Sequence, residues 1–337
     1  MYRTLTYTET RGKFQFVDVR SPKEYEEYTI PGAINIPLFS NEERHIIGTT
    51  YKQCSVEEAV SIGVEFASKN LPEIHKRLIE AKKNSSDIIL FCERGGMRSS
   101  SLYSLLNSVG MKVSKLDGGY KGYRKFVNEN LPLLMEDVDL IVLHGMTGTG
   151  KTQILKELEN KGRKVLDLEG FANHRGSLLG SVGLGKQNCQ RTFESLLLEK
   201  LMDMGPGTYF TEAESSRIGN VIQPKYLLEK LRTGRAVLIE SSMEGRVRRL
   251  VEEYTSSENY SEEILSAVDK MEKYTGAKKA IEFRSLVNKK EFDQLAEIMM
   301  LSYYDPMYGH GQNKHDFEYT FSSDDMEVCI ENLENII

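Results

Sequence analysis

The sequence predicts an α/β protein built from two parallel-sheet domains in tandem. Short apolar runs alternate with helical stretches twice, first up to about residue 130 and again from the run "DLIVLHG" onward. Strands that alternate with helices form parallel sheets. At about 150 residues per domain, the chain is long enough for two. The expected layout is a first domain over residues 1–130, a linker over 131–138, a second α/β domain over 139–254 and a helical C-terminal region with an acidic tail over 255–337.

The first half contains three predicted strands, "FQFVDVR", "GAINIPL" and "DIILFC". Between the first two, "SPKEYEEY" is typical of a short capped helix, with Ser21 as the N-cap and Glu24 three residues later. A long helical insert, "VEEAVSIGVEFASKNLPEIHKRLIEAKK", separates the last two strands, and we expect Pro72 to interrupt it. The segment "LPLLMEDVD" that ends this half has the character of a linker.

The second half repeats the alternation of strands and helices. The predicted strands are "DLIVLHG", "KVLDLEG", "GTYFTEAE" and "RAVLIESS", and "KTQILKELENKG" is a predicted helix. From about residue 255 the chain shows amphipathic helical patterns. These patterns end in a tail with seven acidic residues and no Lys or Arg between His315 and Ile337.

Composition limits the location and the redox state of the protein. No apolar run approaches the roughly 18 residues that span a bilayer. The N-terminus lacks the apolar core of a signal peptide, so we expect a cytoplasmic protein with no membrane partner. The four cysteines lie far apart without a CxxC pair, which disfavours a zinc site or a disulfide framework.

Charge is spread unevenly along the chain. The net charge of −6 taken alone argues against a nucleic-acid partner. However, the segment from Arg217 to Arg249 holds eight basic and three acidic residues. A second basic cluster contains Lys112, Lys115, Lys121, Arg124 and Lys125. Either cluster would allow a polyanion to dock, although a single cluster of this kind is more often a solvated face.

The segment "GMTGTGKT" fits the pattern G-x-x-x-x-G-K-[ST] in full. It follows an apolar strand and precedes a helix, which distinguishes a phosphate-binding loop from an ordinary Gly-rich turn. Backbone N–H groups would surround a diphosphate, the lysine would reach its outer phosphate and the threonine could hold Mg²⁺. The expected diphosphate-binding residues are Gly145, Thr147, Gly148, Gly150, Lys151 and Thr152.

Acidic residues at the end of "KVLDLEG" are candidates to complete a magnesium site with Thr152. These are Asp167 and Glu169. The indication is weaker than for the loop, because acidic residues at strand ends often cap the next element.

The segment "FCERGGMRSSSL" predicts a reactive cysteine. Cys92 directly follows a strand, and the two glycines after it allow N–H groups to turn towards the sulfur. The dipole of the following helix and two arginines would add positive charge, which favours the thiolate. The candidate catalytic residues are Cys92, Arg94, Gly95, Gly96 and Arg98. The alternative is a structural buried cysteine, which is how we interpret Cys54, Cys189 and Cys329.

Two further polar groups lie in the second half at predicted strand ends, where α/β folds place ligand-binding residues. His174, Arg175 and Ser177 stand in "FANHRGSLLG", where the arginine could steady a diphosphate or RNA backbone and the histidine could move a proton. A surface histidine is an equally good interpretation. The other group, in "TEAESSRIG", is Glu212, Glu214 and Arg217, for which a buried ion-pair network is as good an interpretation as a catalytic one.

Two families place a cysteine between a strand and an anion-binding loop, the rhodanese sulfurtransferases and the cysteine-dependent phosphatases. The spacing from Cys92 to Arg98 fits the phosphatases as well. However, "DVRSPKEYEEYTIPGAINIP" resembles the N-terminal rhodanese signature, and "LDGGYKGYRKF" resembles the segment that closes that domain. Phe91 also stands where classical tyrosine phosphatases have His. The first half therefore resembles a rhodanese domain.

A rhodanese-like half joined to a phosphate-loop half resembles the tRNA 2-selenouridine synthase family. The resemblance covers most of residues 10–250 and includes "GTTYKQCS", "DLEGFANHRGSLLG" and "EAESSRIGNVIQP". It implies a rhodanese-like parallel-sheet domain followed by a P-loop NTPase-like α/β domain with a helical C-terminal region.

The family resemblance also implies an activity. The family geranylates 2-thiouridine at the wobble position of tRNA with geranyl diphosphate, and then replaces the S-geranyl group with selenium from selenophosphate. Cys92 would carry the selenium, and a selenophosphate-supplying enzyme would be a partner. No tightly bound cofactor is expected. Whether the phosphate loop binds geranyl diphosphate or a nucleotide stays open. The candidate tRNA-binding residues are Arg246, Arg248 and Arg249.

Other functions remain open on the sequence alone. The main alternative is a sulfurtransferase or cysteine phosphatase fused to a small-molecule kinase. A second alternative is an RNA-binding adaptor with an inactive rhodanese fold, although Cys92 within its Arg-Gly-Gly loop argues against it.

Overall fold

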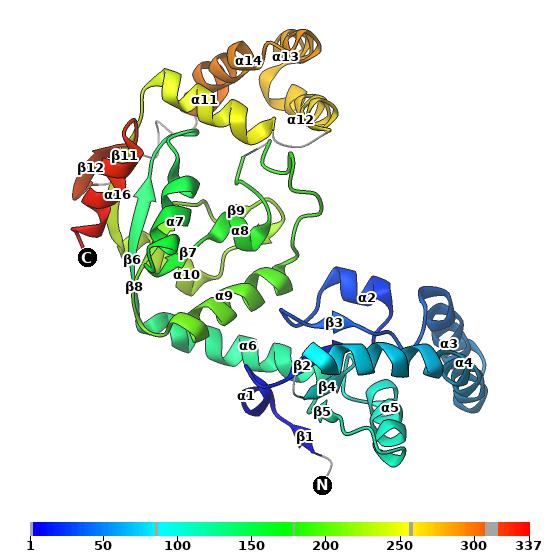
Figure 1. Ribbon diagram of the computed structural model, residues 1–337. Coiled ribbons are helices and arrows are strands. Elements are labelled where there is room, and N and C mark those ends of the chain that lie inside the picture. The colour runs from blue at the N-terminus through cyan, green and yellow to red at the C-terminus, as the bar shows by residue number, and fades with distance from the viewer. Residues whose placement is uncertain (1–2, 85–86, 178, 256–258, 307–315) are drawn as a thin grey trace. The chain divides into compact units, whose positions relative to one another are not determined.

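The computed structural model describes residues 3–84, 87–177, 179–255, 259–306 and 316–337. It divides into two compact units (Figure 1). The first unit comprises Met1–Leu131 with Glu194–Leu196, and the second comprises Pro132–Phe193 and Leu197–Ile337. None of the described helices is both long and apolar enough to cross a membrane.

The first unit is built on a five-stranded sheet in the order β1-β5-β4-β2-β3, in which every pair is parallel. Strand β4 is buried at all four positions, because both faces of the sheet are covered. Asp18 at the end of β2 pairs with Phe91 at the end of β4, so the segments that follow these strands begin side by side. The strands are β1 (Thr4–Leu5), β2 (Gln15–Asp18), β3 (Ile34–Asn35), β4 (Ile88–Phe91) and β5 (Ser114–Leu116).

Six helices belong to or begin in the first unit. They are α1 (Tyr7–Thr10), α2 (Pro22–Glu27), α3 (Asn41–Gln53), α4 (Val56–Asn84), α5 (Met97–Ser108) and α6 (Gly119–Glu136). The capped helix predicted after Ser21 is confirmed, since Ser21 and Glu24 form a reciprocal capping box at α2. The predicted interruption at Pro72 is wrong, because α4 runs through it without a break. Ile74 and Leu78 on this helix are buried in the core, and their burial offsets the roughly 3 kcal/mol that an interior proline costs.

The predicted linker over residues 131–138 contains the boundary between the two units, which lies between Leu131 and Pro132, but most of it is helical. Helix α6 continues through Pro132 to Glu136, and the first strand of the second unit begins at Val138. Leu131 and Met135 are buried one helical turn apart, so this segment packs as a helix rather than as an exposed connection.

The second unit contains a five-stranded sheet in the order β12-β11-β6-β8-β7, again with every pair parallel. The predicted α/β class is therefore confirmed for both sheets. After β6, the chain places β7 and β8 on one lateral side of this strand. It then crosses over and places β11 and β12 on the other lateral side. The strands are β6 (Val138–His144), β7 (Val165–Leu166), β8 (Gly207–Glu212), β11 (Arg235–Glu240) and β12 (Tyr319–Ser322), with a separate antiparallel pair of β9 (Arg217–Ile218) and β10 (Val221–Ile222).

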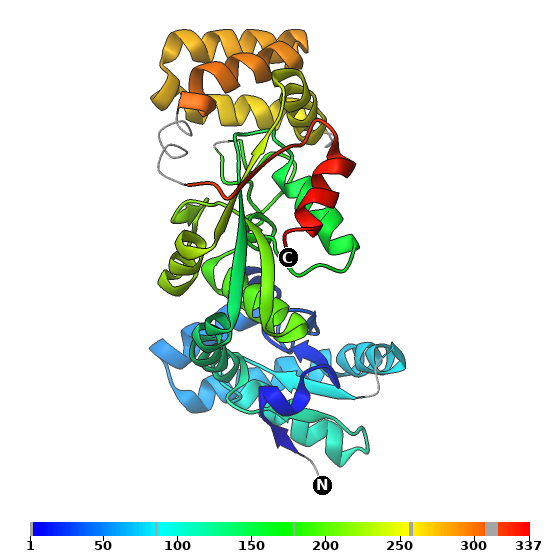
Figure 2. The same ribbon diagram turned by 90° about the vertical axis from the view of Figure 1, so that its left-hand side faces the viewer.

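Helices cover both faces of this sheet and extend beyond the carboxyl ends of its strands. Figure 2 shows α7 and α16 on one face, α10 on the other, and α12 to α14 gathered beyond the strand ends. Helices α12 to α14 share a hydrophobic core with α11, with η1 and with Leu179 and Val182. The helices are α7 (Lys151–Asn160), α8 (Leu168–Ala172), α9 (Gln190–Met204), α10 (Lys225–Thr233), α11 (Met243–Tyr254), α12 (Tyr260–Thr275), α13 (Ala277–Lys289), α14 (Phe292–Met299), a π-helix η1 (Met300–Tyr304) and α16 (Met326–Glu334).

The C-terminal region predicted as helical over 255–337 also contributes a strand. Residues Tyr319–Ser322 form β12, which pairs in parallel with β11. The acidic residues of the tail face solvent, whereas Cys329 and Leu333 on α16 are buried in the core of the second unit. The C-terminal segment thus completes the sheet. Residues 256–258 and 307–315 of the predicted region lie outside the described residues.

We predict that α16 is essential to the stability of the second unit. Leu333→Ala should lower its free energy of unfolding by about 2–5 kcal/mol, because Leu333 is fully buried and truncation leaves a cavity. The matched control is Val328→Ala on the same helix, where the side chain is 50% exposed and the change should stay within about 0.5 kcal/mol. Calorimetric unfolding measures both. Equal small effects would show that the C-terminal helix is not part of the cooperative core.

Candidate functional site

Cys92 directly follows β4 and is buried. Its Sγ lies 3.2 Å from Ser99 Oγ and 3.9 Å from Gly96 O. Ser99 stands in the first turn of α5 and is itself fully buried, so its hydroxyl and the sulfur form a hydrogen bond shielded from water. The sequence analysis identified the helix but not this contact. The signal was the serine immediately after Arg98.

The start of α6 holds the backbone of the Cys92 loop. Tyr120 N donates to Cys92 O and Lys121 N donates to Glu93 O, both at 2.9 Å. Gly119 has a φ of 59°, and a methyl group there would overlap Cys92 O and Gly95 N. Only glycine allows this approach. Gly119 was missed as a site residue, although the Gly-Gly pair in "LDGGYKGYRKF" signals it.

Arg20 anchors the same loop from the neighbouring strand. Its buried guanidinium binds both oxygens of Asp18 and donates to Glu93 Oε2 at 2.9 Å. The rings of Tyr28 and Tyr120 each lie 4.8 Å from its guanidinium carbon. Burial opposes its charge, but the contact with Asp18 raises the pKa of Arg20 above its ordinary value. The "DVR" segment is part of the rhodanese-like signature, and in this fold its arginine fixes Glu93, the residue that follows Cys92.

The two arginines of the loop differ from expectation. Arg98 is paired with both oxygens of Glu24, at 2.6 and 3.1 Å, so its charge is already neutralised. Although burial opposes it, the hydrogen bond from Arg98 lowers the pKa of Glu24. Arg94 is exposed. Besides Arg20, Lys115 contacts this loop, and its Nζ lies 3.3 Å from Gly95 O and 3.0 Å from Ser100 Oγ.

The loop after β6 adopts the conformation that its glycines allow. Gly145, Gly148 and Gly150 all have positive φ, and a methyl group at Gly145 would lie 2.5 Å from Ile239 O. Lys151 opens α7, and its Nζ donates to Gly145 O at 2.8 Å and to Met146 O at 3.2 Å. The lysine therefore folds back over its own loop.

Two arginines predicted to bind tRNA instead hold this loop. Arg246 is 5% exposed, donates to Thr147 O at 2.8 Å and is ion-paired with Asp305 at 2.5 Å. Arg249 is half-buried and donates to Gly148 O at 3.4 Å and to Ser323 O. The expectation for these two is wrong, because α11 turns them towards the loop. Arg248, between them, is exposed.

Three carboxyl groups surround Lys151. Glu169 Oε2 lies 3.3 Å from Thr152 Oγ1, and Glu169 N donates to Glu212 Oε1 at 2.8 Å. Burial, with repulsion from Glu214, raises the pKa of Glu169 to about 8. Burial also raises the pKa of Glu212 well above its ordinary value, and Glu212 Oε2 is buried with no hydrogen-bond partner in the part of the chain that the structure describes. Burial lowers the pKa of Lys151, and the three carboxylates oppose that change.

Asp167, a candidate to complete a magnesium site with Thr152, has a structural contact in this fold. Asp167 Oδ1 accepts a hydrogen bond from Gly170 N at 2.7 Å and caps α8, the role that such residues often have. Thr152 contacts Glu169 instead. Within the described ranges, no group of three or more His, Cys, Asp or Glu residues is arranged to hold a metal ion.

The loop after α8 is held in place by its own polar residues. Arg175 is ion-paired with Glu253 at 2.5 Å and donates to Val182 O, and Ser177 Oγ lies 3.2 Å from Tyr254 OH. These contacts fix the loop, and the expectation that Arg175 steadies a diphosphate or RNA backbone stays a prediction.

His174 and Arg217 also differ in their surroundings. Burial lowers the pKa of His174, whose buried Nδ1 has no hydrogen-bond partner among the described residues. Glu212 and Glu214 lie beside Lys151, whereas Arg217 is exposed on β9. The network expected from Glu212, Glu214 and Arg217 therefore forms with Lys151 rather than with Arg217.

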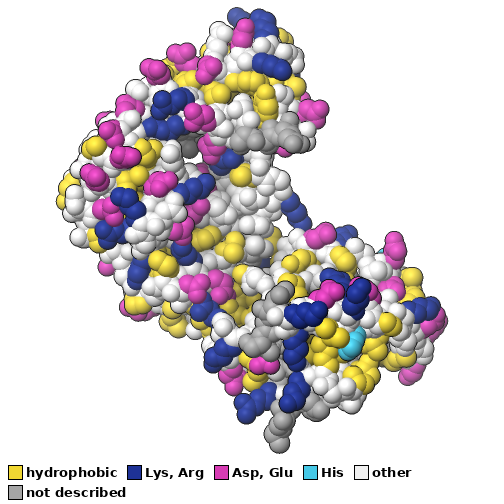
Figure 3. Space-filling view, in the orientation of Figure 1, with side chains coloured by type: hydrophobic (Ala, Val, Ile, Leu, Met, Phe, Trp, Pro, Cys, Tyr) yellow, Lys and Arg dark blue, Asp and Glu magenta, His cyan; other side chains and the backbone are white. Residues whose placement is uncertain are grey.

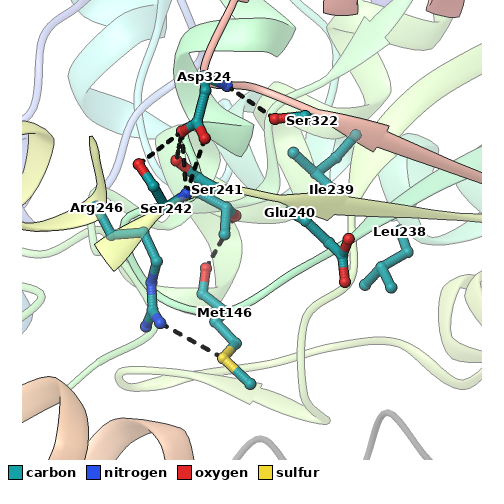
Figure 4. A pocket seen from close by; sticks show the side chains of 10 residues that line it. Met146, Leu238, Ile239, Glu240, Ser241, Ser242, Arg246, Ser322 and Asp324 are labelled. Atoms are coloured by element: carbon teal, nitrogen blue, oxygen red, sulfur yellow. Dashed lines mark hydrogen bonds between the residues drawn. The ribbon is translucent and has the colours of Figure 1, made fainter. Parts of the chain in front are cut away.

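A cavity of about 420 Å³ lies beside the phosphate loop at the ends of β11 and β12 (Figure 4). Asp324 accepts hydrogen bonds from Ser241 Oγ and from Ser242 N, at 2.6 and 3.0 Å, and fixes one wall. The sequence analysis missed these residues, because they follow strands far apart in the chain. The cavity is lined by Met146, Thr149, Leu238, Ile239, Glu240, Ser241, Ser242, Arg246, Ser322 and Asp324.

Two family models match the chain. One described as "Rhodanese-like domain" matches residues 8–126, and one described as "tRNA 2-selenouridine synthase AAA domain" matches residues 138–335. These ranges contain the Cys92 loop and the Lys151 loop, respectively.

Known proteins are similar along nearly the whole chain. A protein from Pseudomonas syringae pv. syringae named tRNA 2-selenouridine synthase is 30% identical over 93% of this chain and 92% of its own. A protein of the same name from Hydrogenovibrio crunogenus is 32% identical over 91% of each chain. A solved N-terminal domain from Clostridium difficile 630 is 42% identical over 37% of this chain and 98% of its own, with a TM-score of 0.36. From the second family match and these full-length relatives, the chain belongs to the tRNA 2-selenouridine synthase family.

Proposed function

We propose that this enzyme converts 2-thiouridine at the wobble position of tRNA to 2-selenouridine in two steps. Geranyl diphosphate first alkylates the sulfur, and selenium from selenophosphate then replaces the S-geranyl group. The observation that carries the proposal is the presence on one chain of two loops with opposite chemistry. One loop surrounds the buried thiol of Cys92, and the other ends in Lys151.

The second unit suits the geranylation step. A diphosphate leaving group gains charge as its carbon–oxygen bond breaks, and that charge must be stabilised. The N–H groups of the loop and the start of α7 would bind the diphosphate, and Lys151 Nζ would exchange Gly145 O and Met146 O for phosphate oxygens. Mg²⁺ is usually coordinated by substrate phosphates together with one or two protein side chains. Thr152 and Glu169, which are in contact, would suit such a site. Such an ion would neutralise phosphate charge.

The first unit suits the selenium step. A chalcogen carrier needs a polarisable nucleophile that is shielded from water, and Cys92 is buried with Ser99 Oγ 3.2 Å from its sulfur. Lys115 brings a positive charge to the same loop. We propose that selenium carried by Cys92 as a selanyl-sulfide bonds to the C2 atom of the base as geranylthiolate leaves. An external thiol then attacks the Cys92 sulfur and cleaves the sulfur–selenium bond, which releases 2-selenouridine and leaves Cys92 in a mixed disulfide.

The pairing of Arg98 with Glu24 argues against the alternative of a cysteine phosphatase. A phosphatase of that kind uses the arginine to bind the phosphate, but here both oxygens of Glu24 occupy the Arg98 guanidinium. Hydrolysis of p-nitrophenyl phosphate by the protein would favour this alternative, as would rapid ATP turnover without RNA.

The tRNA must dock on cations other than Arg246 and Arg249. We propose Lys121 and Lys125, which are exposed and one helical turn apart on α6. Lys121 N also holds Glu93 O, so this surface adjoins the Cys92 loop. On the face in Figure 3, Lys and Arg side chains of the second unit are interspersed with Asp and Glu, which gives RNA less net attraction there.

We predict that Cys92→Ser abolishes 2-selenouridine formation, because the hydroxyl cannot carry selenium. The control is Cys189→Ser, which changes a half-buried thiol at the start of α9 and should leave the product unchanged. Mass spectrometry of nucleosides from tRNA treated with each variant measures the outcome. Product from the first variant and none from the second would overturn the assignment.

The two steps should be separable. Lys151→Ala should block geranylation of 2-thiouridine tRNA but still convert tRNA that is supplied already geranylated, because it removes only the diphosphate contact. Cys92→Ser should instead accumulate the geranylated form. Lys156→Ala on the exposed side of α7 is the matched control for Lys151 and should leave both steps intact. Failure of both site variants at the same step, with the fold preserved, would indicate one composite site.

Salt-dependent binding tests the docking surface. Replacing Lys121 and Lys125 together with glutamine should weaken tRNA binding and reduce the slope of log K against log salt by about one unit per lost phosphate contact. Arg248→Gln serves as the comparison from the second unit and should leave the slope unchanged. The reverse pattern would place the RNA backbone at Arg248.

A further inference from the structure

The cavity beside the phosphate loop lies at the point where the strand order of the second sheet reverses, between β6 and β11. Its walls come from the loop after β6 and from the end of β11, and these two strands are neighbours. After β6 the chain forms strands on one lateral side of β6, and it later crosses over to form β11 on the other lateral side. Open α/β sheets bind ligands at such points, outside the carboxyl ends of the strands. Neither the Cys92 loop nor the carboxyl cluster around Lys151 lines this cavity.

The lining of the cavity does not suit a hydrocarbon chain. Its volume of about 420 Å³ is in the range of small-ligand pockets, which is roughly 300–1,000 Å³. Only Met146, Leu238 and Ile239 are apolar, and the other seven lining residues are polar or charged. A geranyl chain would leave those groups without hydrogen-bond partners, which is costly. A flat heterocycle with a polar edge would use both kinds of wall.

The cavity lining offers the kinds of hydrogen-bonding groups that the edge of a uracil-type base requires. That edge offers one N–H donor, N3, between two acceptors. Glu240 lines the cavity, and its carboxylate is an acceptor that suits N3–H. Ser322 Oγ accepts a hydrogen bond from Asp324 N at 3.2 Å, so its proton is not used in that contact and can be donated to the base. Figure 4 shows Asp324 gathered with Ser241 and Ser242, which gives this wall a fixed shape.

We propose that this cavity is the pocket for the 2-thiouridine nucleoside, turned out of the anticodon loop. Enzymes that modify a base commonly extrude it into a pocket of this kind. The inference rests on the proposed function, because geranyl C1 must lie next to a diphosphate at the loop whose Met146 and Thr149 form one wall. The sulfur–C1 bond would form as the C1–oxygen bond breaks and its electron pair leaves on the diphosphate. The N3 proton would pass to Glu240.

The test uses a bulky substitution in the cavity and a matched one outside it. Ser322→Trp fills the cavity, whereas Thr320→Trp places the same side chain two residues earlier on the same exposed face of β12. Binding is measured with an anticodon stem-loop that carries 2-thiouridine at the wobble position and with one that is abasic there. The unsubstituted protein should bind the first about tenfold more tightly, as expected for a specific base contact. Ser322→Trp should abolish that difference, and Thr320→Trp should preserve it.

A second variant keeps the test decisive if the tryptophan disturbs the fold. Glu240→Ala shortens an exposed side chain, and it should reduce the preference for 2-thiouridine over the abasic loop while leaving binding of inorganic diphosphate unchanged. This binding assay does not require geranylation to occur, so it is independent of failure of the proposed reaction. A preserved preference in both Ser322→Trp and Glu240→Ala would overturn the pocket. If these two variants lost ATP binding but still preferred the 2-thiouridine stem-loop over the abasic one, the cavity would instead be assigned to a free nucleotide.

Discussion

Both candidate sites depend on hydrogen bonds that hold the backbone carbonyl groups of a loop at the end of a parallel strand. At the Cys92 loop, Tyr120 N and Lys121 N hold the first two carbonyls. At the Lys151 loop, Lys151, Arg246 and Arg249 donate to four successive carbonyls, from Gly145 to Gly148. Peptide groups whose oxygens are engaged on one side present their N–H groups on the other, where an anion can bind. Two unrelated loops therefore have their carbonyl groups held by different donors, an arrangement that the proposed binding of an anion at each loop would use.

The charges behind these loops are buried, which makes them sensitive to the loss of a partner. Arg20 and Arg246 each keep a carboxylate partner inside the protein, and removal of one partner would leave an uncompensated charge. The cluster at Lys151 is balanced differently. Because the pKa of Glu169 is about 8, this carboxyl is largely protonated at neutral pH, whereas it would be ionised in the unfolded chain. Folding thus takes up a proton there, and the site loses stability as pH rises from the unfolded value towards 8.

Sequence patterns could predict the loops but not the partners that fix them. The Gly-rich pattern up to Thr152 and the placement of Cys92 after a strand are local, and both sequence positions have the expected backbone in the structure. Gly119 and Arg20 are 27 and 72 residues away from Cys92 in the sequence. They reach the loop only because the strands pair in this register. The error over Arg246 has the same origin. A count of charges along the chain cannot show which side of α11 faces the loop.

Strand β12 shows how a polar tail becomes part of a site. Its alternating Tyr319 and Phe321 pack into the core, and the parallel pairing with β11 brings Ser322 and Asp324 beside the serines that end β11. Ser323 then accepts from Arg249 and donates to Thr149 O, which links the C-terminal segment to the phosphate loop. The acidic tail therefore does more than set the net charge. It supplies both a wall of the proposed nucleoside pocket and a support for the loop that would bind the diphosphate, so the two ligands of one alkylation share a single framework.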